Sequence, residues 1–171
     1  HIAGGKTVFH EINQKTFQLD DSLLEKVNKN TKMIIVNSPS NPTGAVYPRD
    51  LLVEMVNIAR RYRVFMICDE TYMRLVYGTV KTAHLSEVIT DVPGIALRGI
   101  SKEYPWPGAR CGWIEVFNQD KLHFKRYIKS LLNAKMLEVC STSLPQFSIP
   151  LIMSDPRYEE HLAARCAEYE R

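Results

Sequence analysis

The sequence predicts an α/β fold, a three-layer α/β/α sandwich with a mostly parallel sheet. Short continuous apolar runs recur along the chain, and such runs are typical of strands covered on both faces. An amphipathic helical pattern separates two of these runs, and turn-rich segments follow them. Strands that alternate with helices favour a parallel sheet with helices on its faces. The length of 171 residues and the 45% hydrophobic content suit a globular domain with a real core.

The first third of the chain contains two predicted strands and one short helix. Residues 6–12 alternate loosely between apolar and polar side chains and predict a strand. Asp20-Asp21-Ser22 is a candidate N-cap for a helix that runs to Val27. Met33-Ile34-Ile35-Val36 is a continuous apolar run and predicts a buried strand. A loop rich in proline and glycine, residues 37–47, follows it.

A helix and three more strands are predicted in the middle of the chain. The helix begins at Pro48 and carries an apolar stripe as far as Tyr62. Val64–Cys68 is the next buried strand, and it runs directly into Asp69-Glu70-Thr71-Tyr72. Residues 95–97 predict another strand, which leads to Ser101-Lys102, and residues 111–116 predict the last one.

Helical patterns dominate the chain from Asp120 onward. We expect them to be broken near Pro145, Pro150 and Pro156, because proline removes a backbone donor from a helix interior. The helical pattern after Pro156 continues to the last residue of the chain without a stop signal. This ending, together with the absence of an initial methionine, predicts that the chain is a fragment of a longer protein.

Composition argues against several functional classes. The formal net charge of +3 and the lack of a basic run mixed with aromatic residues do not favour nucleic-acid binding. No stretch is long and apolar enough to predict a membrane span, and no signal peptide is recognisable. The four cysteines form no CxxC pair, so we expect no zinc site and a reducing, cytoplasmic location.

Polar residues follow three of the predicted strands. Asn41, Asp69 and Lys102 each lie just beyond the end of a strand. Because ligands of parallel sheets bind beyond the carboxyl ends of the strands, we expect these three side chains to converge on one crevice.

The chemistry of this set suits a cofactor with a charged heteroaromatic ring. Burial of Lys102 would lower its pKa and favour the neutral amine that Schiff-base formation needs. Asp69 can bind a protonated pyridine nitrogen, Tyr72 can donate its phenol hydrogen to the same crevice, and Arg110 can bind a phosphate with its guanidinium fork. We reject an acid/base pair of Asp69 with Glu70, because neighbours on an extended chain point to opposite faces.

Each of these residues also has an ordinary structural interpretation. A lone lysine is usually a solvated surface group, and Asp69 can simply cap a turn. Tyr72 can be an amphipathic surface side chain, and Arg110 can belong to a surface ion pair of little energetic value. The residues around Asn41 are common turn formers.

The order of the motifs separates these interpretations. Ser-Asn-Pro-Thr-Gly at residues 40–44, Asp-Glu-x-Tyr at residues 69–72 and the stretch from Ser101 to Trp113 follow one another along the chain. The last stretch reads Ser-Lys-Glu-Tyr-Pro-Trp-Pro-Gly-Ala-Arg-Cys-Gly-Trp. This series resembles the signature of the class I/II aminotransferases, enzymes of fold type I that use pyridoxal 5′-phosphate (PLP).

The resemblance implies a role for each residue. Lys102 matches the lysine that forms a Schiff base with PLP and moves the proton between the substrate and the cofactor. Asp69 matches the partner of the pyridine nitrogen, and Tyr72 matches the phenol that binds the ring oxygen. Asn41 matches the amide beside that oxygen, and Arg110 matches the phosphate-binding arginine. The resemblance also implies a cis peptide bond before Pro42.

One position departs from the family pattern. The family commonly has a serine three residues before the lysine as a phosphate ligand, and Gly99 stands there in this chain. Ser101 matches a serine often found beside the lysine and is the weaker candidate for cofactor binding.

The resemblance also implies a domain division and an incomplete sheet. Residues 1–155 match the central part of the PLP-binding large domain, and residues 156–171 match the truncated start of the interdomain helix. The strand at residues 111–116 is antiparallel in the family, and its usual neighbour would be missing here, which leaves an unpaired edge. The phosphate loop, the aromatic residue that stacks on the ring and the arginine for the substrate carboxylate would lie outside the chain.

The implied activity is transfer of an amino group between an amino acid and a 2-oxo acid, in a homodimer of the full-length protein. We expect no nucleic-acid or membrane partner, and little or no activity from the chain alone. Two other functions remain open on the same scaffold. One is a PLP-dependent carbon–sulfur β-lyase, and the other is a non-catalytic effector domain of a transcription regulator.

Overall fold

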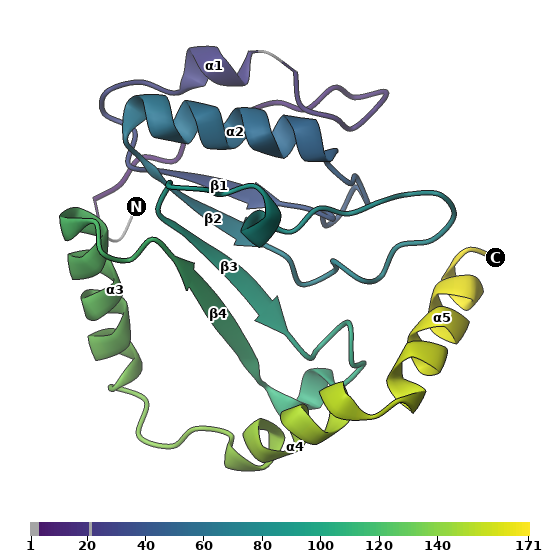
Figure 1. The fold of residues 1–171 in the computed structure, drawn as a ribbon. Helices are drawn as coiled ribbons and strands as arrows, with labels where there is room; N and C mark the ends of the chain where they lie inside the picture. Colours follow the sequence, from purple (N-terminus) through teal and green to yellow (C-terminus); the bar gives the residue numbers. More distant parts are fainter. Residues whose placement is uncertain (1–3, 21) are drawn as a thin grey trace.

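The computed structural model describes residues 4–20 and 22–171, which build a four-stranded sheet with helices on both faces (Figure 1). The strands are β1 (Met33–Asn37), β2 (Phe65–Asp69), β3 (Gly94–Gly99) and β4 (Gly112–Phe117), in the spatial order β1-β2-β3-β4. The first three are parallel, and β4 pairs antiparallel with β3. The predicted α/β class, the mostly parallel sheet and the direction of the fourth strand are confirmed.

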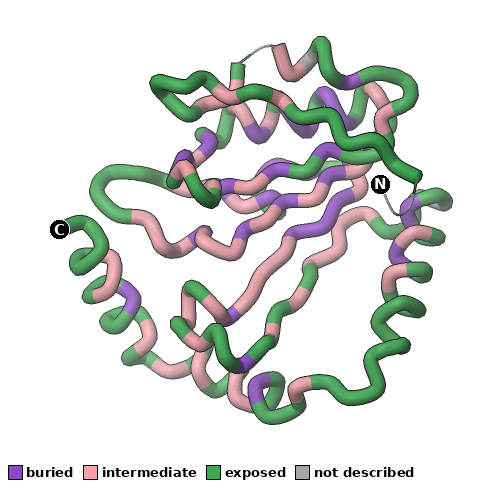
Figure 2. The backbone as a smooth tube through the Cα atoms, turned by 180° about the vertical axis from the view of Figure 1, so that it is seen from behind, coloured by how far each residue is buried: buried purple, intermediate pink, exposed green. Residues whose placement is uncertain are grey.

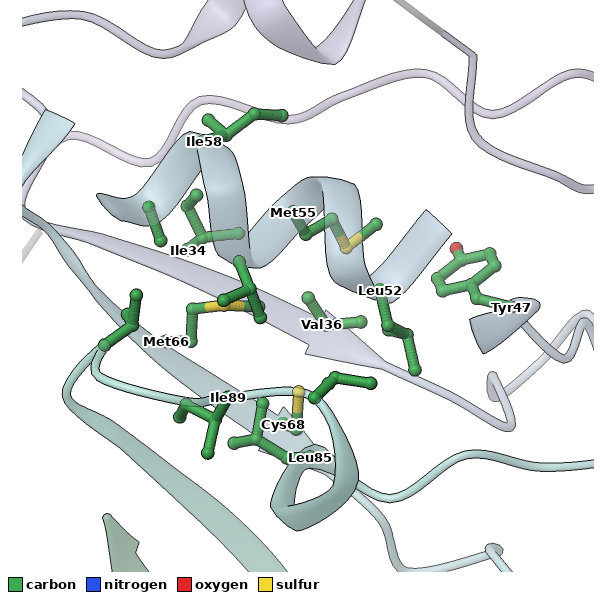
Figure 3. Packing of buried hydrophobic residues seen from close by; sticks show 14 of the residues in the cluster. Ile34, Val36, Tyr47, Leu52, Met55, Ile58, Met66, Cys68, Leu85 and Ile89 are labelled. Atoms are coloured by element: carbon green, nitrogen blue, oxygen red, sulfur yellow. The ribbon is translucent and has the colours of Figure 1, made fainter. Parts of the chain in front are cut away.

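Helix α2 (Arg49–Tyr62) covers one face of the sheet. It follows Pro48, whose φ of −65° suits the residue before a helix, and it ends at Arg63 in the left-handed conformation. Its apolar stripe is buried and packs on the strands, as Figure 3 shows for Met55 above Val36 and Met66. Each such aliphatic side chain contributes about 1.5–3 kcal/mol when fully buried. The short helix α1 (Leu23–Lys26), with Ser22 as N-cap, agrees with the prediction there.

Helix α3 (Leu122–Lys135) packs on the opposite face of the sheet. Phe124 and Ile128 are buried against Ile95, and the ring centroids of Phe65 and Phe124 lie 5.2 Å apart. The three-layer arrangement is therefore present. The expectation that the strand at residues 33–36 is covered on both faces was wrong. Ile35 in β1 is 68% exposed, because α3 packs on β2, β3 and β4 and does not extend over β1.

Two other expectations about elements were wrong. Residues 6–12 do not form a strand, because within the described residues no strand lies beside them to take up their backbone hydrogen bonds. Pro150 does not break a helix, since it lies inside α4 (Ser143–Ser154). The expected break near Pro145 is present, because α3 ends at Lys135 and α4 begins two residues before this proline. Pro145 occupies the first turn, where a backbone N–H has no helical partner to lose. As predicted, Pro156 precedes a new helix, α5 (Arg157–Tyr169).

Large apolar side chains are exposed along the end of α3 and along α4, where Figure 2 shows a mostly exposed segment. They are Leu132, Met136, Leu137, Val139, Leu144, Phe147, Leu151 and Met153. No helix in the described part of the chain has the length and hydropathy that a membrane crossing requires.

Candidate functional site

The carboxyl ends of the parallel strands meet at one edge of the sheet. Asn37, the last residue of β1, is in register with Asp69, the last residue of β2, and Asp69 is in register with Leu97 of β3. The backbone ladder continues past these ends, because the N–H of Ser38 donates to the Asp69 carbonyl at 3.3 Å and that of Glu70 donates to the Leu97 carbonyl at 3.0 Å. The loops that follow the strands therefore begin side by side.

Lys102 and Tyr72 are brought together at this edge. The Lys102 Nζ lies 5.7 Å from the centroid of the Tyr72 ring, within the range of a cation–π contact. Tyr72 is half-buried, whereas Lys102 is exposed. The burial considered for Lys102 is thus not found in this structure, because the residue lies in a loop three positions beyond the end of β3.

Asp69 caps the turn that follows β2. Its Oδ1 accepts hydrogen bonds from the backbone N–H of Thr71 at 3.0 Å and from the Thr71 hydroxyl at 2.6 Å. The side chain is half-buried, and among the described residues Oδ2 has no hydrogen-bond partner. The capping interpretation is therefore correct for one oxygen, and the other oxygen remains available to a ligand.

The loop after β1 presents Asn41. The peptide bonds before Pro39 and Pro42 are cis, so the expected isomer at Pro42 is present and the one at Pro39 was not foreseen. Gly44 has a φ of 71°, which favours glycine, and its N–H donates to the Ser40 carbonyl at 2.7 Å. This tight turn leaves Asn41 exposed.

A cavity of about 310 Å³ lies between this loop and the turn after β2. Its lining includes Asn41, Tyr72 and Tyr77. Asp69, Lys102 and Arg110 are not part of the lining. Asn41 and Tyr72 therefore both line the cavity, and Lys102 contacts Tyr72 without lining the cavity itself.

Arg110 and Ser101 lie in the segment between β3 and β4. Arg110 is exposed and follows the short helix η2 (Pro107–Ala109), where its Nη1 donates to the Pro107 carbonyl at 2.7 Å. No ion pair involves Arg110 in the described part of the chain, so the surface ion-pair interpretation is not supported. Ser101 is half-buried beside Lys102. No contact among the described residues joins either one to Asp69 or Tyr72.

Glycines bring β3 and β4 close together beneath this segment. Gly99 ends β3 and is in register with Gly112. A Cβ atom at Gly112 would lie 2.7 Å from the Arg98 carbonyl oxygen, closer than a side chain can approach. Gly99 therefore belongs to a close strand pairing at the position where the family commonly has serine.

Sequence reasoning missed a buried charge cluster next to Asp69. The Glu70 side chain is 1% exposed, and its Oε2 lies 3.0 Å from Arg98 Nη2 and 2.9 Å from His84 Nδ1. Its Oε1 accepts from the backbone N–H of Leu85 at 2.6 Å. Glu70 and Asp69 share no partner among these contacts, since Asp69 is bonded to Thr71. Because the partners of Glu70 are distant in sequence, no spacing rule points to the cluster.

No group of three or more metal-binding side chains occurs among the residues with described positions. The available donors are an amine, a carboxylate, a phenol, an amide and a guanidinium. This set can bind an anionic organic molecule that carries both a basic ring and a phosphate.

Comparison with known proteins identifies relatives along the whole chain. The profile of the family described as aminotransferase class I and II matches residues 1–171. An uncharacterized aminotransferase of Methanocaldococcus jannaschii is 52% identical over 85% of this chain and 34% of its own length. The glutamate-pyruvate aminotransferase AlaA of Haemophilus influenzae is 34% identical over 86% of this chain and 37% of its own length.

Solved structures agree with this result. The aromatic aminotransferase of Pyrococcus horikoshii matches 99% of this chain and 45% of its own with a TM-score of 0.86 and 26% identity. An alanine aminotransferase of Pyrococcus furiosus matches 89% of this chain and 39% of its own with a TM-score of 0.79 and 29% identity. The chain spans about a third of the length of the curated relatives that it matches.

Proposed function

The chain belongs to the class I and II aminotransferase family, and from this premise we propose that it supplies the lysine-bearing centre of an enzyme that moves an amino group between an amino acid and a 2-oxo acid. The observation that carries the proposal is the approach of the Lys102 amine to the Tyr72 ring at 5.7 Å, at the strand edge that also holds Asp69. The cofactor of the proposed reaction is PLP.

The residues present fit this cofactor. Asp69 keeps one carboxylate oxygen free of hydrogen bonds within the described residues, and this oxygen can accept a hydrogen bond from a protonated pyridine nitrogen. The Tyr72 phenol is half-buried beside the cavity and can donate to the ring oxygen. Arg110 uses only Nη1 in a contact with its own loop, which leaves the rest of its fork for a phosphate. Asn41 supplies an amide from the lining of the same cavity.

When bound, PLP supplies an electron sink for negative charge at the substrate Cα. Lys102 Nζ would attach the cofactor and, once the substrate amine has released it, would take the proton from the substrate Cα and deliver it to the cofactor carbon. Asp69 would stabilise the positive charge on the ring nitrogen by its own negative charge. Tyr72 and Asn41 would orient the ring, Arg110 would anchor the phosphate, and Ser101 is a weaker candidate for the same anchor.

The surroundings of this centre form part of the proposal. We assign residues 1–155 to the central part of the PLP-binding domain and residues 156–171 to the start of the interdomain helix. The apolar side chains exposed along α3 and α4 support further polypeptide over that surface. A homodimer in the cytoplasm is proposed on the basis of family membership alone.

A chimera tests the proposed reaction. The chain replaces the matching segment of its M. jannaschii relative, and the chimera is supplied with PLP, an amino acid donor and a 2-oxo acid acceptor. We expect transfer of the amino group to the acceptor, and loss of transfer in Lys102→Arg. Transfer that persists in Lys102→Arg would contradict the role of this lysine. Release of pyruvate and ammonia from cystathionine, without transfer, would favour the lyase instead.

A further inference from the structure

Helix α5 contacts the loop that carries Lys102. Arg165 donates from Nη1 to the Lys102 carbonyl at 3.2 Å, and its Nη2 donates to the carbonyl of the next residue, Glu103. One guanidinium thus binds two consecutive carbonyls. Because the guanidinium is planar and rigid, this pair of bonds fixes the direction of the loop as well as its distance from the helix.

Tyr158 adds a second contact from the same face of α5. Residues 158 and 165 lie two helical turns apart and therefore point the same way. The Tyr158 hydroxyl donates to Glu103 Oε1 at 2.5 Å, and its ring stacks on Tyr104 with centroids 4.7 Å apart. Burial, followed by the Glu103 carboxylate, raises the pKa of Tyr158, so the phenol keeps its proton and acts as a donor.

The same helix also contacts the turn that carries Tyr72. Arg74 Nη2 lies 2.6 Å from Glu159 Oε2, and the Arg74 guanidinium lies 5.1 Å from the centroid of the Tyr158 ring. The Cys166 thiol donates to the Arg74 carbonyl at 3.6 Å. Between the two loops themselves, Arg74 Nη1 and Glu103 Oε1 form an ion pair at 3.7 Å, which is longer than a hydrogen bond.

We propose that α5 sets the position of Lys102 relative to Tyr72, with Arg165 and Tyr158 as positioning residues that act through the Lys102–Tyr104 loop. The inference rests on the proposed function for its meaning, since Lys102 needs a defined position only if its amine reacts. Neither residue touches the reacting atoms. The contact is nevertheless made to the backbone of Lys102 itself, so a shift of α5 is passed directly to that residue.

Hydrogen exchange on the 171-residue chain without cofactor tests the positioning step. Arg165→Met removes both bonds to the loop, Arg165→Lys keeps the charge but not the fork, and Tyr158→Phe keeps the ring stack but not the bond to Glu103. Arg157→Met is the matched control, because Arg157 on the same helix contacts only Asp155 among the described residues. Amides of β2 serve as the internal reference for global unfolding.

We expect exchange of residues 100–106 to rise about fivefold or more in Arg165→Met, since the loss of one hydrogen bond changes an opening equilibrium by roughly that factor. Arg165→Lys should give a smaller rise and Arg157→Met none. If Arg165→Met also accelerates exchange in β2, its effect includes global unfolding, and Tyr158→Phe then tests the loop instead. For Tyr158→Phe we expect a rise in exchange that is confined to residues 100–106. Unchanged exchange of this segment in both Arg165→Met and Tyr158→Phe would overturn the proposal.

Borohydride trapping of PLP separates this inference from the proposed function. After reduction and proteolysis, the share of label on Lys102 is compared with that on the other lysines. We expect a high share in the unchanged chain and in Arg157→Met, and a lower share in Arg165→Met. A low share in the unchanged chain would count against the proposed function, and the exchange result would still decide whether α5 positions the loop. A high share that Arg165→Met leaves unchanged would overturn the inference alone.

Discussion

The Lys102 amine lies over the ring of Tyr72, 5.7 Å from its centroid. Lys102 follows β3 and Tyr72 follows β2, so this contact joins two loops that the sequence separates by thirty residues. The two strands are parallel neighbours, and their carboxyl ends therefore deliver both side chains to one edge of the sheet.

Replacing Tyr72 by phenylalanine should weaken PLP binding while leaving the ring below Lys102 in place. The phenol is the proposed donor to the ring oxygen, and loss of a hydrogen bond to a charged group corresponds to roughly a tenfold or larger loss of affinity. Absorbance titration of the chain with PLP measures this affinity. Tyr77→Phe is the control, because Tyr77 lines the same cavity but is exposed. Equal affinities for the two variants would contradict the role of Tyr72.

Replacing Asp69 by asparagine should separate the effect of its negative charge from the effect of its hydrogen bonds to Thr71. The amide oxygen of asparagine can accept the two bonds from Thr71, so the free energy of unfolding should change by less than about 1 kcal/mol. The charge at the ring nitrogen is lost, so amino-group transfer by the chimera should fall by about a hundredfold or more. Thermal unfolding and initial rates measure the two effects. A stable variant with a nearly unchanged rate would show that Asp69 is only a cap.

Replacing Glu70 should mainly lower the stability of the fold, because its carboxylate is buried among charged side chains. Glu70→Gln removes the carboxylate beside His84 and the buried partner of Arg98, which within the described residues then keeps only the partly exposed Glu115. Breaking a buried ion pair costs about 3–5 kcal/mol. Denaturant unfolding should therefore show a large loss of stability. Glu168→Gln, on the exposed side of α5, should change stability by less than about 0.5 kcal/mol. Similar stabilities for the two variants would contradict the claim that the Glu70 cluster stabilises the fold.

The Cys68 thiol should be inert at neutral and mildly alkaline pH. Burial, and after it the negative charges of Glu70 and Asp69, raise the pKa of Cys68 from 9.0 to about 12. A pKa raised in the folded state contributes stability that is complete below the unfolded value and is lost as pH rises from about 9 towards about 12. Alkylation with iodoacetamide at pH 8.5, followed by mass spectrometry, should label the exposed Cys140 and spare Cys68. Rapid labelling of Cys68 in the folded chain would contradict this.

Most of the sheet and its helices could be predicted from the local pattern. The apolar runs marked all four strands, and the stripe from Leu51 to Tyr62 marked α2. The errors came from tertiary context. The alternation at residues 6–12 has no neighbouring strand within the described residues to complete it, and the face of β1 with Ile35 lacks a covering layer. Pro150 was expected to break the helical pattern but lies inside α4.

The candidate site was accessible from sequence only in part. Asn41, Asp69 and Lys102 could be identified because each follows a strand, and a parallel sheet then brings them to one edge. The roles assigned to all the site residues came from the resemblance and remain predictions. Arg165 and Glu70 could not be identified, because their contacts join segments distant in sequence and depend on how α5 and the turn after β2 fold back.

Trapping of PLP on the chain tests the central assignment most directly. The chain is incubated with PLP, reduced with borohydride and mapped by mass spectrometry, with pyridoxal as the comparison that lacks a phosphate. We expect the label to concentrate on Lys102, to depend on the phosphate through Arg110, and to disappear from that position in Lys102→Arg without moving to another lysine. Label spread evenly over the lysines, with no preference for Lys102 or for PLP over pyridoxal, would contradict the account.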